Sequence, residues 1–99
     1  MLGTHMLTEI EDYCRNHIHT ESPLLKELQE KTKAKMEAPQ MLSGHLEGRL
    51  LKMLVQVSGA RRALEIGMFT GYSALCIAEG LPPDGRLITC DVDPECAKI

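Results

Sequence analysis

The chain has 99 residues, of which 43% are hydrophobic and 3% aromatic, and its formal net charge is -3 at pH 7. This length is short even for one α/β domain and leaves no room for a second. The weakly negative charge lacks the basic field with which proteins attract nucleic acids or acidic membrane surfaces. No apolar run is long enough to cross a bilayer, and no secretory signal pattern is present. We therefore expect neither a nucleic-acid nor a membrane partner.

The first part of the chain predicts two helices. Thr8 to His19 forms the first, with Thr8 and Glu11 in the spacing of a reciprocal capping box. The second begins at Ser22 and Pro23, because serine is a good N-cap and proline suits the first helical position. Lysines follow at its end, where we expect a solvated surface rather than an anion site.

A third helix is expected from Ser43, as N-cap, to about Ser58, with Gly59 ending it. Its apolar residues recur at helical spacing, and we expect this stripe to face a sheet. The stripe consists of Leu46, Leu50, Met53, Leu54 and Val57.

A short apolar strand, a turn with two spaced glycines and a helix come next. The strand is Ala63–Ile66, the glycines are Gly67 and Gly71, and the helix covers Tyr72 to Leu81. In an open α/β sheet this order builds a cofactor site at the carboxyl end of the strand. An ordinary turn without a ligand is the alternative.

A second strand, Arg86–Cys90, ends on Asp91, about 20 residues after the glycines, where a nucleotide-binding fold places the acceptor for ribose hydroxyls. Glu65, at the end of the first strand, is placed to face an ammonium group. Gly67 lets the backbone approach a ligand closely. The glycines lack the G-x-G-x-x-G spacing of a pyrophosphate cradle, so the pattern suits S-adenosylmethionine better than NAD. Part of a dehydrogenase remains a further alternative.

Two residues of the predicted helix belong to the same candidate site. Ser73 offers a hydroxyl donor near the helix N-terminus, where a ligand carboxylate is favoured by free backbone N–H groups. Tyr72 starts the helix beside it. Alternatively, Ser73 is simply a residue of the first helical turn, and Tyr72 is simply a packed ring.

The cysteines show no metal or redox spacing. We expect reduced thiols in a cytoplasmic protein, serving as small core residues. They are Cys14, Cys76, Cys90 and Cys96.

Residues 65–73 (E-I-G-M-F-T-G-Y-S) and 81–94 (L-P-P-D-G-R-L-I-T-C-D-V-D-P) resemble the cation-dependent O-methyltransferase family, which includes catechol and caffeoyl-CoA O-methyltransferases. The resemblance extends over about Pro39 to Pro94. It adds Met41, as a wall packing on the cofactor, and Phe69 of the glycine turn to the candidate cofactor-binding residues.

The resemblance implies an α/β fold: the N-terminal half of a Rossmann-like class I methyltransferase, helices followed by β-α-β, truncated after the second strand. Residues 1–6 would be a tag or a disordered start. Residues 7–38 would form cover helices, and residues 39–99 a partial domain that binds S-adenosylmethionine.

The function that the resemblance implies is methyl transfer from S-adenosylmethionine to a catechol-like or phenolic hydroxyl. In the family a divalent cation, usually Mg²⁺, holds that substrate, and its ligands lie beyond the second strand. We therefore assign no catalytic and no metal-binding residue, and we expect the 99-residue chain alone to be inactive. The alternative is a truncated, non-catalytic module that binds cofactor or self-assembles. An open edge on the first strand favours a homo-oligomer.

Overall fold

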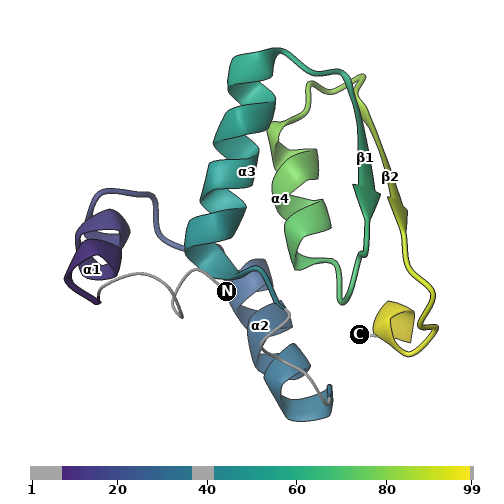
Figure 1. Cartoon of the computed structure of the whole chain (residues 1–99), viewed down its shortest axis with the longest axis horizontal. Helices are drawn as coiled ribbons and strands as arrows, with labels where there is room; N and C mark the ends of the chain where they lie inside the picture. The colour runs from purple at the N-terminus through teal and green to yellow at the C-terminus, as the bar shows by residue number, and fades with distance from the viewer. Residues whose placement is uncertain (1–7, 37–41, 99) are drawn as a thin grey trace.

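The computed structural model describes residues 8–36 and 42–98 of the chain. The predicted cofactor residue Met41, and the start assigned to residues 1–6, lie outside these ranges. In chain order the elements are α1 (Thr8–Asn16), α2 (Pro23–Lys35), α3 (Gly44–Ser58), β1 (Arg62–Ile66), α4 (Tyr72–Gly80), β2 (Arg86–Cys90) and a 3-10 turn, η3 (Cys96–Lys98). Figure 1 shows α3 and α4 side by side, with the strands beside α4 and α2 near the carboxyl ends of the strands.

Strands β1 and β2 are parallel neighbours and are connected through α4, so the predicted β-α-β unit is confirmed. The register pairs Glu65 with Thr89. Burial alternates along each strand, and the half-buried residues of β1 are Ala63 and Glu65. Because neighbouring side chains on a strand point to opposite faces, one face of the sheet lies against α4. Leu64 and Ile66 on the other face are exposed.

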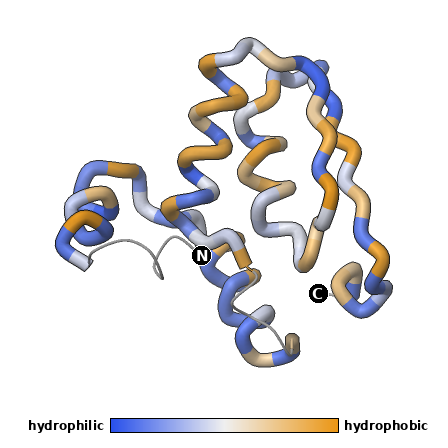
Figure 2. The backbone as a smooth tube through the Cα atoms, viewed as in Figure 1, coloured by the Kyte–Doolittle hydropathy of each residue, from blue (hydrophilic) through white to orange (hydrophobic). Residues whose placement is uncertain are grey.

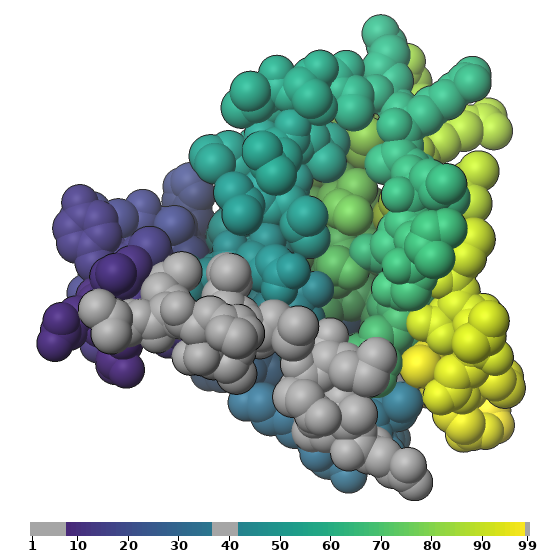
Figure 3. All heavy atoms as spheres, viewed as in Figure 1, coloured from purple at the N-terminus to yellow at the C-terminus, as the bar shows by residue number. Residues whose placement is uncertain are grey.

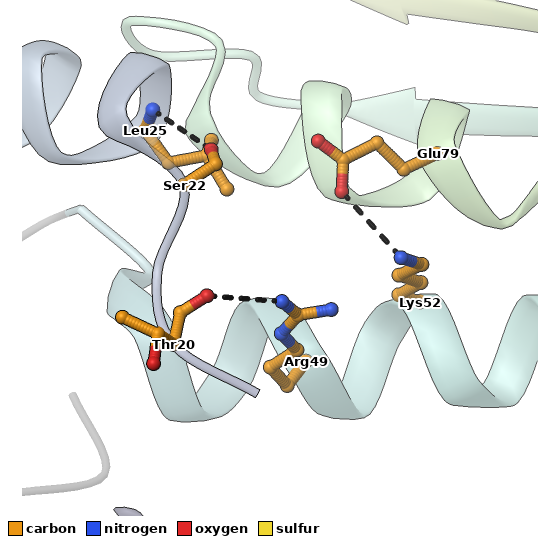
Figure 4. Close-up of polar contacts among 6 residues, drawn as sticks. All are labelled: Thr20, Ser22, Leu25, Arg49, Lys52 and Glu79. Atoms are coloured by element: carbon orange, nitrogen blue, oxygen red, sulfur yellow. Dashed lines mark hydrogen bonds and ion pairs between the residues drawn. The ribbon is translucent and has the colours of Figure 1, made fainter. Parts of the chain in front are cut away.

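Helix α3 packs on α4, and two glycines allow the close approach. A Cβ built on Gly48 would lie 2.6 Å from the sulfur of Cys76, and one built on Gly80 would lie 2.8 Å from the carbonyl oxygen of Lys52. Lys52 Nζ also lies 3.8 Å from a carboxylate oxygen of Glu79 on α4 (Figure 4). Side-chain bulk at either glycine would push the two helices apart.

The stripe on α3 does not face the sheet as the sequence predicts. Four of its residues are more than two-fifths exposed: Leu50, Met53, Leu54 and Val57. The reason is that α3 buries its glycine-containing face against α4 instead. Figure 2 shows hydrophobic residues along α3, α4 and both strands, and in Figure 3 α4 is visible between α3 and β1. The exposed part of the stripe is called the α3 stripe below.

The predicted helix ends are correct in part. Ser22 Oγ accepts the Leu25 N–H at 3.3 Å as an N-cap (Figure 4), and Gly59 ends α3 with a left-handed φ of 68°. The side chain of Ser43 makes no cap bond, although α3 begins beside it. Helix α1 ends at Asn16, earlier than predicted, because the ring of His17 donates back to a carbonyl of the last turn.

The segment between α1 and α2 is attached to α3 by polar contacts. His45 Nε2 donates to the His19 carbonyl at 2.9 Å, and Arg49 donates to the Thr20 carbonyl at 3.3 Å (Figure 4). The buried core lies next to this attachment, around Leu25 of α2 and Tyr72 of α4. The core therefore sits at the N-terminal end of α4, directly beside the glycine turn. None of the helices within residues 8–36 and 42–98 has the length and apolar character needed to span a membrane.

Candidate cofactor site

The turn between β1 and α4 has an unusual backbone. Gly67, Phe69 and Gly71 all have positive φ values, of 91°, 52° and 94°. Glycine adopts such values without steric cost, whereas a phenylalanine in this region stores strain that the surroundings must hold. No atom lies within 4 Å of a Cβ built on Gly67, so the backbone conformation and not crowding requires glycine there.

The end of β2 holds this turn by hydrogen bonds. The Cys90 carbonyl accepts the N–H groups of Gly67, at 2.7 Å, and Met68, at 3.0 Å. A carboxylate oxygen of Asp91 accepts the N–H of Phe69 at 2.8 Å. The left-handed backbone conformation of Phe69 is thus fixed by Asp91, the residue that the sequence assigns to the ribose hydroxyls.

Asp91 is exposed and its carboxylate is ionised at neutral pH. The backbone N–H of Asp93, at 2.9 Å from Oδ1, contributes most to lowering the pKa of Asp91, followed by the N–H of Phe69. Hydrogen bonds of this kind favour the charged form. Each carboxylate oxygen accepts one of these bonds and retains a free lone pair for a ligand.

The Glu65 carboxylate is held between two hydroxyl groups. Thr89 on β2 donates to Oε1 at 2.7 Å, and Ser73 in the first turn of α4 donates to Oε2. The group is half-buried at the end of β1, as predicted. Ser73 is thus engaged with Glu65, and its proton is not free for a ligand carboxylate. Fixed in this way, Glu65 can accept further bonds from a cation without losing rotamer freedom on binding.

Tyr72 fills the space beneath the turn and is 1% exposed. Its hydroxyl donates to the carboxylate of Glu21, just before α2. Burial, and then the contact with Glu21, raise the pKa of Tyr72 far above its ordinary value. The ring lines the pocket, while the hydroxyl is hydrogen-bonded to Glu21 in the segment that precedes α2.

A small pocket opens at the turn, and four of the predicted cofactor residues line it. These are Gly67, Phe69, Tyr72 and Ser73, and the remaining lining residues are Leu42, Ser43 and Met68. From the sequence, Ser43 is expected only to cap a helix, although it lies within the stretch from Pro39 to Pro94 over which the family resemblance extends. The lining does not include Glu65 and Asp91, which lie at the two strand ends nearby.

The N-terminus of α4 contributes backbone donors. Gly71, its N-cap, has no side chain to cap the helix, so the first N–H groups have no side-chain acceptor. Such groups, with the helix dipole, favour a carboxylate or another anion. Within residues 8–36 and 42–98, no group of three or more His, Cys, Asp and Glu side chains is placed to hold a metal ion.

A glycine turn between a parallel strand and a helix, with an acidic residue at the end of each strand, is the arrangement of a Rossmann-like fold, the class that holds many nucleotide-cofactor proteins. Comparison with known proteins identifies the family within this class. The family model described as O-methyltransferase matches residues 15–99, and the chain belongs to this family. The predicted family and the predicted Rossmann-like fold are confirmed, and the family match decides against the dehydrogenase alternative.

Individual relatives agree with this membership. The chain is 39% identical over 79 residues to mouse catechol O-methyltransferase domain-containing protein 1, covering 80% of this chain and 30% of that protein. It is 42% identical over 71 residues to caffeoyl-CoA O-methyltransferase 1 of Zea mays, covering 72% and 27%. The crystal structure of an O-methyltransferase from Bacillus cereus in complex with SAH superposes with a TM-score of 0.83 at 31% identity, covering 99% of this chain and 43% of that one. The chain thus spans well under half the length of these proteins.

Proposed function

We propose that this chain forms the S-adenosylmethionine-binding part of an O-methyltransferase that methylates a phenolic or catechol-like hydroxyl. The observation that carries the proposal is the Glu65 carboxylate, fixed by two hydroxyls at the end of β1 and next to the pocket of the glycine turn. An anchored carboxylate beside the first N–H groups of α4, which have no side-chain acceptor, matches the ammonium and carboxylate of a methionyl group. The SAH-bound bacterial relative supports the choice of cofactor.

The chain's own residues would bind and orient the cofactor. Glu65 would accept the methionyl ammonium, and the first N–H groups of α4 would face the methionyl carboxylate. Asp91 would accept the ribose hydroxyls through its free lone pairs. Gly67 would let the backbone lie close to the ligand, and Ser43, which also lines the pocket, would add a hydroxyl.

The bound cofactor would supply an electrophilic methyl group on its sulfonium. The residues named above would orient this group, and we propose no metal ligand and no catalytic residue among them. The names of the relatives support the phenolic substrate class: one is a caffeoyl-CoA O-methyltransferase and one a catechol O-methyltransferase domain-containing protein.

Calorimetric titration with S-adenosylhomocysteine tests the proposal. We expect saturable binding to the 99-residue chain, which NAD does not displace. Glu65→Ala should weaken binding by about ten-fold to a hundred-fold, because a hydrogen bond to a charged group is lost. Glu79→Ala is the matched control, since that carboxylate lies at the far end of α4. Absence of binding at millimolar ligand, or equal affinity of the two variants, would contradict the proposal.

A further inference from the structure

A buried pair of threonine hydroxyls joins α2 to the glycine turn. Thr32 Oγ1 and Thr70 Oγ1 lie 2.8 Å apart, although the residues are 38 positions apart in the chain. Thr32 is 0% exposed and Thr70 is 7% exposed, so water does not compete for this bond. A hydroxyl contact shielded in this way has a well-defined geometry and is costly to leave unmade.

The direction of the bond follows from the other partner of Thr32. Its hydroxyl donates to the Leu28 carbonyl, one turn earlier in α2, at 2.7 Å. Because a hydroxyl carries a single proton, Thr32 must accept from Thr70. Both hydroxyl rotors are therefore fixed, and Thr70 is directed toward α2.

Thr70 occupies the most constrained part of the site. It lies between Phe69 and Gly71, which both have left-handed backbone conformations. Asp91 holds the turn from the side of β2 through the N–H of Phe69. Thr32 holds the same turn from the side of α2. The strained conformation at Phe69 is thus supported from two elements that belong to different parts of the chain.

We propose that Thr32 is a positioning residue for the cofactor site. By accepting from Thr70, it keeps the glycine turn in the shape that lines the pocket, and it couples the docking of α2 to cofactor binding. This inference rests on the proposed function. Coupling of this kind is reciprocal, so bound cofactor also holds α2 in place. Thr32 does not line the pocket, so it acts on the cofactor site only through the contact between α2 and the glycine turn.

Four variants test the coupling by titration with S-adenosylhomocysteine. Thr32→Val keeps the shape of the side chain and removes the hydroxyl, and we expect about a ten-fold loss of affinity, within the usual range for coupled sites. Thr32→Ser restores the hydroxyl and should bind within about two-fold of the wild type. Thr70→Val should match Thr32→Val, and the double valine variant should be no worse than either one, because all three lack the same bond.

A control variant distinguishes a loss of positioning at the glycine turn from a general loss of stability. Cys76→Ala removes a buried sulfur from the α3–α4 contact and keeps the hydrogen bonds that hold the turn, in which Cys76 takes no part. We expect it to lower the melting temperature with little loss of affinity. Equal losses of affinity in Thr32→Val and Cys76→Ala, or a failure of Thr32→Ser to restore binding, would overturn the inference.

Hydrogen exchange measured without ligand tests the contact between α2 and the turn independently of the proposed function. The N–H of Phe69 donates to the Asp91 carboxylate, and the N–H of Gly71 donates to the Met68 carbonyl within the turn. We expect their exchange to accelerate several-fold in Thr32→Val and to stay at the wild-type rate in Thr32→Ser. Unchanged exchange in Thr32→Val would overturn the coupling even if the cofactor binds. If the wild type bound no S-adenosylhomocysteine, the proposed function would fail while this measurement still decided the coupling.

Discussion

Glu65 accepts a hydrogen bond at 2.7 Å from Thr89, the residue directly opposite it in the parallel register of β1 and β2. The pairing of the strands thus places a hydroxyl beside the carboxylate that the sequence assigns to the cofactor. Ser73 completes the arrangement from α4. All three parts of the β-α-β unit contribute to the position of one functional group, so the fold itself orients Glu65.

Removing the Thr89 hydroxyl should weaken cofactor binding without abolishing it. Thr89→Val keeps a β-branched side chain in β2, and Ser73 still holds the other oxygen of Glu65. We expect S-adenosylhomocysteine affinity to fall by only about three-fold to ten-fold, because Thr89 orients Glu65 and does not itself bind the cofactor. Thr89→Ser should retain the wild-type affinity. Identical titration curves for the valine and serine variants would contradict this role.

The buried phenol of Tyr72 should make the protein sensitive to alkali. Because its folded pKa is raised, the folded state keeps a proton that the unfolded chain releases above the ordinary pKa of 10.0. Stability from this group is therefore complete below pH 10 and is lost as the pH rises above it. We expect the free energy of unfolding of the wild type to fall more steeply above pH 10 than that of Tyr72→Phe.

Denaturant titrations at pH 8 and at several values above pH 10 measure this difference. At pH 8, Tyr72→Phe should be less stable by about 1 kcal/mol, since the bond to Glu21 is lost. A Tyr13→Phe background leaves Tyr72 as the single tyrosine, so absorbance reports its ionisation directly. Parallel stability curves for Tyr72→Phe and the wild type would show that Tyr72 ionises without cost to the fold.

The contact between α3 and α4 should not tolerate a methyl group at Gly48. The new Cβ would meet the sulfur of Cys76 at 2.6 Å and the Tyr72 ring at 3.1 Å. We expect Gly48→Ala to lower stability by about 1–3 kcal/mol through overpacking, despite the better helix propensity of alanine. Adding Cys76→Ala should recover part of the loss. Thermal unfolding of the two single variants and the double variant measures this coupling.

The local features of the fold could be predicted from the sequence. The strand Arg86–Cys90, the cap at Ser22 and the end of α3 at Gly59 each follow from residues adjacent to them. The bond between Thr32 and Thr70 could not be predicted, because it joins residues 38 positions apart and nothing in the motif around Thr70 indicates a partner in α2.

The positions of the candidate site residues are also easier to predict than their hydrogen-bond partners. Glu65 and Asp91 lie at strand ends, as the sequence indicates. The hydroxyl of Tyr72, however, contacts Glu21 from a distant segment. The predicted orientation of the α3 stripe is wrong. An apolar pattern indicates which helix face would gain from burial, but it does not indicate which surface is available to cover that face.

The exposed apolar surface should drive self-association of the 99-residue chain. The α3 stripe is exposed, and so are Leu64, Ile66 and Ile88 on the open face of the sheet. Among the described residues the sheet has only two strands, so each has a free edge that can pair with another chain. Apolar surface removed from water contributes roughly 25 cal/mol per Å², which favours association of such faces.

Sedimentation velocity over a range of concentrations tests this prediction. We expect oligomers at about 100 μM that dissociate on dilution, and a shift toward monomer in Leu54→Lys and Ile88→Lys, because each places a charge on an apolar face. Gln56→Lys is the matched control, since it adds the same charge at a polar, exposed position of α3. A wild-type chain that sediments as a single monomer at that concentration would contradict the prediction. Equal effects of Leu54→Lys and Gln56→Lys would assign the association to net charge and not to the apolar faces.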